Sequence, residues 1–199
     1  MQTKYNIEGL KKLINEGLQP RYLFFWGHTA PAGEETGKFV FSQWYPSSFT
    51  VNGTTYKTAE HWMMAQKALL FDDLDAFQKI IAAPKPAAAK ALGRSVHNYE
   101  DTRWNEVKFE IVVQGNIHKF VQNKALSAYL MGTGDRVIVE ASPVDPVWGI
   151  GLAQDSPGAL HPDNWKGENL LGFALMEARE FLRNGKDPGT LNLSLNRNK

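Results

Sequence analysis

The sequence predicts an α+β fold that is predominantly helical, with a small β element near the N-terminus and one short strand further on. Two observations carry this prediction. Apolar residues recur at helical spacing through most of the chain, and strand-like segments are few and short. The length of 199 residues suits one domain with a substantial core and is short for two. We therefore expect a single domain over residues 1–199, with its core at about 21–182.

The first elements follow from spacing and turn residues. Apolar residues at helical spacing over 5–18 predict an amphipathic N-terminal helix, which Pro20 ends. The apolar run over 21–26 predicts a short buried strand, and residues 39–44 predict another. Between these strands, residues 27–37 hold proline, glycine and glutamates, which predict an exposed loop.

A hairpin and a series of helices are predicted for the middle of the chain. Asn52-Gly53 accepts the positive φ angles of a type I′ turn, and its flanks over 49–56 are β-branched or aromatic. Thr58 is expected to cap the helix that follows. Helices are predicted over residues 58–70, 72–81, from Pro84 or Pro86 to Gly93, 101–123, 124–131 and 168–182.

The last predicted strand precedes a long irregular segment. Residues 136–140 alternate like a short strand. Residues 141–167 contain prolines, glycines and two tryptophans without a clear period. A long loop in a compact domain is usually functional or disordered, and the tryptophans argue for order. The tail from Asn184 onward is polar, and we expect it to be frayed.

Composition excludes several classes of protein. The chain has no cysteine, which excludes disulfides, zinc ribbons, iron–sulfur clusters and thiol nucleophiles. Its formal net charge of +1 lacks the basic excess of a protein that holds nucleic acid mainly by the phosphates. The sequence shows no signal-peptide or membrane-spanning pattern, so we expect a cytoplasmic protein with no membrane partner. The oligomeric state is left open.

The segment 58–67 carries the first candidate site. On a helix, Glu60, Met63 or Met64, and Lys67 fall along one face. Apolar surroundings raise the pKa of a carboxylic acid and lower that of a lysine, which is what acid–base or imine chemistry needs. A solvated glutamate and lysine that flank a buried methionine pair would explain the same pattern.

The segment 139–151 carries the second candidate site. A strand end would deliver Glu140 and a turn would deliver Asp145. Trp148 precedes Gly149, which would let the backbone approach a ligand closely. Carboxylates beside an aromatic platform suit a sugar or nucleobase pocket. A structural turn with a packed tryptophan is the alternative.

Two further residues are candidates for ligand binding. Arg94 follows a helix stop, and its planar guanidinium matches phosphate, although a surface arginine is the commoner case. Asn169, near a helix start, is either a ligand contact or a cap for that helix. The histidines are scattered without metal-ligand spacing, and the common phosphate-binding motifs are absent. We therefore expect neither a metal site nor a cofactor.

An ordered series of residues is more specific than any single motif. Its members are Phe41-Ser42, Asn52-Gly53, Tyr56, Thr58-Ala59-Glu60-His61, Gln66-Lys67-Ala68, Ala89-Lys90, Gly93-Arg94, Trp104, Lys119-Phe120, Glu140, Asp145, Trp148-Gly149, Gly151, Gly167, Asn169, Leu171-Gly172, Leu175-Met176 and Arg179. In this order, over about 21–182, they resemble the NADAR (YbiA-like) family. That family includes riboflavin-intermediate N-glycosidases and ADP-ribosyl-guanine glycohydrolases. The chain departs from it at Gln43, where relatives carry asparagine.

The resemblance implies a cofactor-free hydrolase that cleaves the bond between a ribose and an exocyclic amino nitrogen. On this basis we hypothesise that Lys67 forms a transient Schiff base with the opened sugar. Glu60 would then move protons, and Asp145 would orient ribose hydroxyls or water. The residues expected to contact the substrate are Trp148, Gly149, Arg94, Glu140, His61 and Asn169.

Removal of ADP-ribose from guanine ranks first among the substrates that the resemblance implies, because the segment 25–28 and the longer chain look like that branch of the family. A ribosylaminopyrimidine phosphate of the riboflavin pathway ranks second, and the near-neutral charge favours such a small nucleotide. The implied partners are a nucleotide-type substrate and, transiently, ADP-ribosylated DNA. A module that binds ADP-ribose or NAD without cutting it is the alternative from another class. The pair of Glu60 and Lys67 argues against that alternative.

Overall fold

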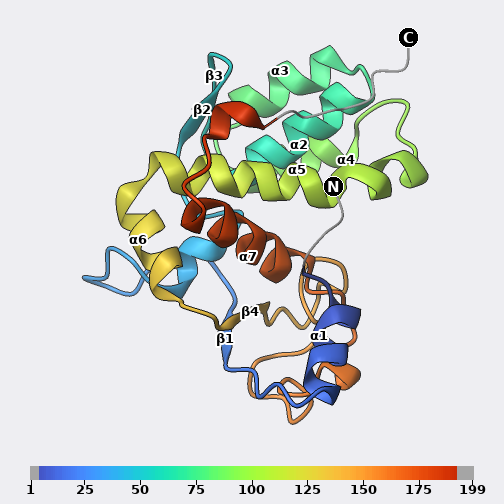
Figure 1. Cartoon of the computed structure of the whole chain (residues 1–199). Coiled ribbons are helices and arrows are strands. Elements are labelled where there is room, and N and C mark those ends of the chain that lie inside the picture. The colour runs from blue at the N-terminus through green and yellow to red at the C-terminus, as the bar shows by residue number, and fades with distance from the viewer. Residues whose placement is uncertain (1–4, 192–199) are drawn as a thin grey trace. The chain divides into compact units, whose positions relative to one another are not determined.

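The computed structural model describes residues 5–191, and they form the mostly helical α+β fold that the sequence predicts (Figure 1). The chain divides into two compact units. Unit 1 holds the residues up to 42 together with 125–184, and unit 2 holds 43–124 together with the residues from 185 onward. The fold class is therefore confirmed, and the single domain over 1–199 stays a prediction. No helix within residues 5–191 has both the length and the apolar character to cross a membrane.

Unit 1 is built around a two-stranded parallel sheet. Its strands are β1 (Tyr22–Phe25) and β4 (Val137–Glu140), and Phe25 lies opposite Glu140. Because the strands are parallel, the chain leaves both of them at the same edge of the sheet. The helices of this unit are α1 (Ile7–Asn15), η1 (Lys38–Phe41), α6 (Lys124–Gly132), η2 (Pro162–Asn164) and α7 (Leu170–Arg183), and α7 packs on β4.

Helix α1 ends earlier than the sequence predicts. At its start, the side chain of Asn6 accepts the backbone N–H of Gly9 at 2.8 Å and caps the helix. At its end, Gly17 has a φ of +104°, a conformation that glycine adopts at little cost. Pro20 therefore lies beyond a helix that a glycine has already ended.

The prediction of a strand over 39–44 is wrong. Residues Lys38–Phe41 form the 3-10 helix η1. Phe39, Val40 and Phe41 are all buried in succession, whereas a strand with one buried face would alternate. A short apolar run shows that a segment is buried, but it does not distinguish a strand from a helical turn.

Unit 2 combines a hairpin with a group of helices. Its elements are β2 (Phe49–Val51), β3 (Thr54–Tyr56), α2 (Ala59–Leu70), α3 (Leu74–Ala82), α4 (Pro86–Arg94), α5 (Asp101–Gln122) and η3 (Pro188–Thr190). The predicted turn is confirmed, because Asn52 and Gly53 have φ angles of 48° and 78°. The predicted cap is also confirmed, since Oγ1 of Thr58 accepts the backbone N–H of His61 at 3.3 Å.

Helices α2 and α5 pack against each other in opposite directions. Nε1 of Trp62 donates to the backbone oxygen of Ile111 at 2.8 Å. A Cβ at Gly115 would lie 2.4 Å from the Trp62 ring, so a larger residue there would push the helices apart. Near the start of α5, the ring of Trp104 lies 5.6 Å from Nζ of Lys67, in the last turn of α2. The end of α5 therefore lies beside the start of α2.

The C-terminal tail is partly ordered where a frayed segment is predicted. Residues Pro188–Thr190 form η3, which contacts α5. Residues 192–199 lie outside the described part of the chain.

Candidate active site

Glu60 lies in the first turn of α2 and is almost completely buried, with 2% of its surface exposed. Its backbone N–H, which the helix cannot satisfy internally, donates to the backbone oxygen of Gln43 at 2.9 Å. Removing a carboxyl group from water is costly, and proteins concentrate such groups at sites with a task for them. The structure thus places the predicted proton-transfer group inside unit 2.

Lys67 lies in the last turn of the same helix, half-buried against aromatic rings. Its Nζ is 3.9 Å from the ring centroid of Tyr99 and 5.6 Å from that of Trp104. Burial lowers the pKa of Lys67, and the negative charge of Asp101 offsets part of this effect. The faces of the two rings attract the charged form of the amine. Lys67 is therefore a partly desolvated cation.

Glu60 and Lys67 share one face of α2 but lie far apart along it. Seven residues separate them, which corresponds to about 10 Å of helix at 1.5 Å per residue. Neither side chain is fully solvated, so the alternative of a solvated pair does not describe them.

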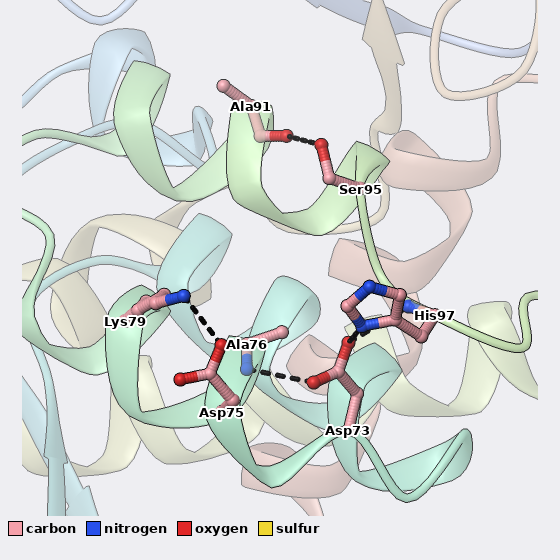
Figure 2. Close-up of polar contacts among 7 residues, drawn as sticks. All are labelled: Asp73, Asp75, Ala76, Lys79, Ala91, Ser95 and His97. Carbon is pink, nitrogen blue, oxygen red and sulfur yellow. Dashed lines mark hydrogen bonds and ion pairs between the residues drawn. The ribbon is translucent and has the colours of Figure 1, made fainter.

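The segment that carries Tyr99 is fastened to the start of α3 (Figure 2). Oδ2 of Asp73 accepts the backbone N–H of His97 at 2.9 Å and lies 2.9 Å from Nδ1 of that ring. Oδ1 accepts the backbone N–H of Ala76 and caps α3. These hydrogen bonds, first among them the one from the His97 backbone, lower the pKa of Asp73. Tyr99, two residues beyond His97, is thereby held near the amine of Lys67.

His61 has both ring nitrogens engaged inside unit 2. Nε2 lies 3.2 Å from the backbone oxygen of Ala83, which can only accept, so Nε2 carries the proton. Nδ1 therefore accepts from the hydroxyl of Thr58 at 2.8 Å. Burial lowers the pKa of His61, which favours this neutral form. The contacts give His61 a structural task at the start of α2, and its contact with substrate stays a prediction.

Arg94 ends α4 and is exposed. The residue before it, Gly93, packs so tightly on α2 that a Cβ there would lie 2.0 Å from the sulfur of Met64. Met64 lies between Glu60 and Lys67 on α2. The end of α4 thus lies beside the part of α2 between Glu60 and Lys67.

Lys119 is a candidate that sequence reasoning missed. It lies in the last turn of α5 with no exposed surface, and its Nζ is 5.3 Å from the ring of Phe120. Burial lowers the pKa of Lys119 to about 7. A signal was present, because Val112, Asn116 and Lys119 follow helical spacing on the buried face, where a lysine is unusual.

In unit 1, Asp145 organises the turn before Trp148. Its Oδ1 accepts the backbone N–H groups of Val147 at 2.9 Å and Trp148 at 2.8 Å. Asp145 and Trp148 are both half-buried. One carboxylate oxygen thus shapes the loop, and its fixed position orients the second oxygen. The prediction of a turn with an ordered tryptophan is confirmed at this level.

The glycine after Trp148 approaches the protein's own backbone. A Cβ at Gly149 would lie 2.9 Å from the backbone oxygen of Glu140. That oxygen accepts the N–H of Ile150 at 2.9 Å, and the oxygen of Gly149 accepts the N–H of Asn169 at 3.0 Å. Gly149 therefore lets the loop lie against the end of β4. The close approach that was expected toward a ligand is made toward the chain itself.

Asn169 joins the start of α7 to β4. It is fully buried, with its Oδ1 accepting the N–H of Glu140 at 2.9 Å and its Nδ2 donating to the oxygen of Ile138 at 3.0 Å. Its φ of 54° is left-handed, a conformation that asparagine tolerates better than most residues. The side-chain amide is thus hydrogen-bonded to the strand and does not cap α7, and its contact with substrate stays a prediction.

The predicted site residues fall into two groups, and their contact with substrate stays a prediction. Those in unit 2 are Glu60, His61, Lys67 and Arg94. Those in unit 1 are Glu140, Asp145, Trp148, Gly149 and Asn169. Within residues 5–191, His, Asp and Glu side chains form no cluster of three or more that could hold a metal ion.

Comparison with known proteins shows which family the chain matches. The family model described as the NADAR domain matches residues 24–183. The chain is 44% identical to an N-glycosidase of Acanthamoeba polyphaga mimivirus over 165 residues, covering 80% of this chain and 95% of the relative. It is 34% identical to a riboflavin biosynthesis protein of Vibrio vulnificus over 71% of this chain and 35% of that one. The NMR structure of the E. coli protein YbiA matches with a TM-score of 0.67 and 28% identity, covering 84% of this chain and 88% of YbiA.

Proposed function

The chain belongs to the NADAR domain family, and we propose that it is a hydrolase of N-glycosyl bonds that removes ADP-ribose from the exocyclic amino group of guanine. The observation that carries the proposal is the burial of the Glu60 carboxyl on a helix pair that also holds lysine amines. A carboxyl and an amine in apolar surroundings suit proton transfer and imine formation. Similarity to an N-glycosidase along 95% of that relative supports the same type of bond.

The chemistry of this bond fits those groups. A ribose on an exocyclic nitrogen can open to a protonated imine, so cleavage does not require a free oxocarbenium ion. An enzyme amine can then replace the leaving nitrogen at C1, and water releases the sugar. Glu60 would move protons between the nitrogens and water, a contribution of about 10²–10⁴-fold in rate. Unit 2 offers Lys67 and Lys119 as the amine, and its geometry distinguishes between them.

The remaining candidates are assigned to substrate binding. We assign Arg94 to a phosphate, because its helix ends beside the Met64 stripe of α2. Trp148 would stack on a base, to which it presents a half-buried ring. The second oxygen of Asp145 would orient ribose hydroxyls or water, since Oδ1 is held by two backbone N–H groups.

The choice of guanine rests on the segment after β1. Trp26, the first residue beyond that strand, is 59% exposed. A large exposed aromatic side chain suits stacking on a nucleobase of a larger substrate. The near-neutral net charge is consistent with local recognition of the modified nucleotide rather than of a long phosphate backbone.

A ribosylaminopyrimidine phosphate is the second candidate substrate. The similarity to a riboflavin biosynthesis protein favours it, although the chain spans about a third of that relative. The two substrates share a ribose on an exocyclic nitrogen, so the same Glu60 chemistry would serve both. They differ in the second phosphate, the adenosine and the base.

A side-by-side assay tests this function. A single-stranded oligodeoxynucleotide with one ADP-ribosylated guanine is compared with the ribosylaminopyrimidine phosphate, and kcat/KM is measured for each. We expect the guanine substrate to be preferred by about 10²-fold or more, because a site built around a second nucleotide loses those contacts with the smaller substrate. A reversed order would establish the second candidate. Tight binding of ADP-ribose in calorimetry, with no cleavage of either substrate, would contradict the enzymatic function.

A further inference from the structure

The contact between α2 and α5 has a lysine at each end. Lys67 lies at the end where α5 begins, against Tyr99 and Trp104. Lys119 lies in the last turn of α5. From Trp104 to Lys119 the helix rises about 22 Å at 1.5 Å per residue. The two lysines are therefore carried by opposite ends of the helix pair.

Glu60 belongs to the end of the pair that holds Lys119. The backbone oxygen of Gln43 accepts the N–H of Glu60 at 2.9 Å, and its side-chain oxygen accepts from Nδ2 of Asn116 at 3.1 Å. One residue thus bridges the first turn of α2 and the last part of α5. Lys119 lies one turn beyond Asn116 on the same helix, at the spacing of side chains that share a face.

The two amines also differ in their surroundings. The rings of Tyr99 and Trp104 attract the charged form of Lys67. Lys119 has no exposed surface, and burial lowers its pKa to about 7. Burial therefore favours the neutral form of this amine, and the neutral form is the nucleophile. Burial lowers the pKa of both amines, and an aromatic ring lies near each, but Lys67 also keeps contact with solvent and the negative charge of Asp101, whereas Lys119 has no exposed surface.

We propose that Lys119, and not Lys67, is the amine that bonds to the sugar, with Glu60 as its proton-transfer partner at the same end of the helix pair. The inference rests on the proposed N-glycosidase function and names the residue that forms the covalent intermediate. Lys67, two turns along α2 from Glu60, takes the role of a cation that binds another part of the substrate.

The proposed step conserves atoms and electrons. Nζ of neutral Lys119 adds to C1 of the opened, protonated glycosylamine, and the C=N electron pair moves to the guanine nitrogen. Glu60 carries a proton from Nζ to that nitrogen, the C1–N bond breaks, and guanine leaves with C1 joined to Nζ as an iminium. Water adds to C1 and loses a proton by way of Glu60 to Nζ. The C1–Nζ bond then breaks as the C1 hydroxyl gives its proton to Glu60, which frees the neutral amine and the ribose aldehyde, and nothing is oxidised or reduced.

The burial of Lys119 adds one requirement. Its amine has no exposed surface, so the side chains that cover it must move aside when the sugar enters. The covalent adduct is therefore expected on a peptide of α5 that is poorly labelled by amine reagents in the absence of substrate.

Trapping of the intermediate in the wild-type protein tests the proposal directly. The enzyme is mixed with the ADP-ribosylated oligodeoxynucleotide, or with the ribosylaminopyrimidine phosphate, and treated with borohydride during turnover. Peptide mass spectrometry then locates the reduced sugar adduct. An adduct on Lys119 supports the proposal, whereas turnover with the adduct on Lys67, or with no adduct, overturns it. Absence of turnover with both substrates would instead show failure of the proposed function.

Two variants provide a matched comparison. Lys119→Met keeps the length of the side chain without the amine, and we expect a loss of at least ~100-fold in kcat/KM of the folded protein. Lys67→Arg keeps a cation over Tyr99, so its loss should appear in KM, with kcat kept. Lys124→Met, at an exposed position at the start of α6, is the matched control and should leave kcat/KM unchanged. Wild-type kcat/KM should rise with pH through about 7 as Lys119 loses its proton. An active Lys119→Met variant would overturn the proposal, and if that variant fails to fold, the trapping result on the wild type decides.

Discussion

Helix α2 and the loop at residues 141–167 use their polar side chains in different ways. In α2, hydrogen bonds within the helix, the Thr58 cap and the backbone oxygen of Gln43 hold the path of the chain, and the carboxyl of Glu60 and the amine of Lys67 lie along one face of it. In the loop and at its end, Oδ1 of Asp145 accepts two backbone N–H groups, and the amide of Asn169 pairs with two backbone groups of β4.

The difference follows from what the backbone needs. A loop has few regular hydrogen bonds, and its buried N–H and C=O groups must find side-chain or irregular partners. A polar residue in a loop is therefore used first to build the loop. A buried ionisable side chain on a helix lowers stability, because it loses its hydration without being needed by the backbone. Such a residue is therefore a candidate for a catalytic or binding role. If this comparison is correct, substitution of Glu60 should lower kcat/KM and leave the free energy of unfolding nearly unchanged. Substitution of Asn169 should lower the free energy of unfolding and affect kcat/KM less.

The largest effect is expected for Glu60→Gln. The amide keeps the size of the side chain but cannot transfer a proton, so kcat/KM should fall by about 10²–10⁴-fold. Activity is measured on both glycosylamine substrates, and stability by urea unfolding. Glu106→Gln, at an exposed position of α5, is the matched control and should leave both quantities unchanged. An unfolding midpoint that drops while the rate of the folded protein is kept would place Glu60 with the structural residues.

Asn169→Ala tests the other side of the comparison. The change leaves the N–H of Glu140 and the C=O of Ile138 without their side-chain partner, and each buried group without a partner costs about 1–3 kcal/mol. We expect the free energy of unfolding to fall by about 2–4 kcal/mol, measured in urea. Asn169→Asp keeps the acceptor for Glu140 and should lose less. A stable Asn169→Ala protein without activity would show that the substrate contact predicted from the sequence is the main role.

The fold was predictable where local chemistry and tertiary structure agree. The Asn52-Gly53 turn and the Thr58 cap are set by residues whose backbone preferences are strong, and both are confirmed. The strand predicted at 39–44 fails because an apolar run reports burial and carries no period. The end of α1 was misplaced because Gly17 ends the helix before Pro20 can.

The candidate site was predictable in part, for a different reason. Spacing on one helix is visible in a sequence, so the stripe of Glu60 and Lys67 could be found. Partners on other elements are not visible, and the bridge from Gln43 to Glu60 and Asn116 emerges only after folding. Lys119 escaped notice because a lysine in a long helix is ordinarily solvated, and its spacing from Val112 and Asn116 was a weaker signal than that expectation.

The smallest effect is expected at Asp73, which lies between α2 and α3 in unit 2. Like Asp145 in unit 1, it accepts hydrogen bonds from backbone N–H groups. Its carboxylate caps α3 and holds the backbone of His97, near Tyr99 (Figure 2). Asp73→Ala should lower the free energy of unfolding by about 0.5–2 kcal/mol, as for other helix caps, and reduce kcat/KM by no more than about fivefold.

The pH dependence of the difference in unfolding free energy between the wild type and Asp73→Ala tests whether the ionised carboxylate causes it. The folded pKa of Asp73 is lowered from 3.8, so the ionised group stabilises the fold fully above that value, and the contribution is lost as the pH falls below it. The unfolding free energies of the wild type and of Asp73→Ala should therefore differ at pH 7 and approach each other as the pH falls below about 4. Asp75→Ala, which removes an exposed carboxylate from the first turn of the same helix, is the matched control and should show a smaller change. If the difference in unfolding free energy between the wild type and Asp73→Ala persisted unchanged at low pH, Asp73 would act by packing and not by its charge. Asp73 in unit 2 would then differ from Asp145 and Asn169 in unit 1, whose side chains hold the backbone by hydrogen bonds.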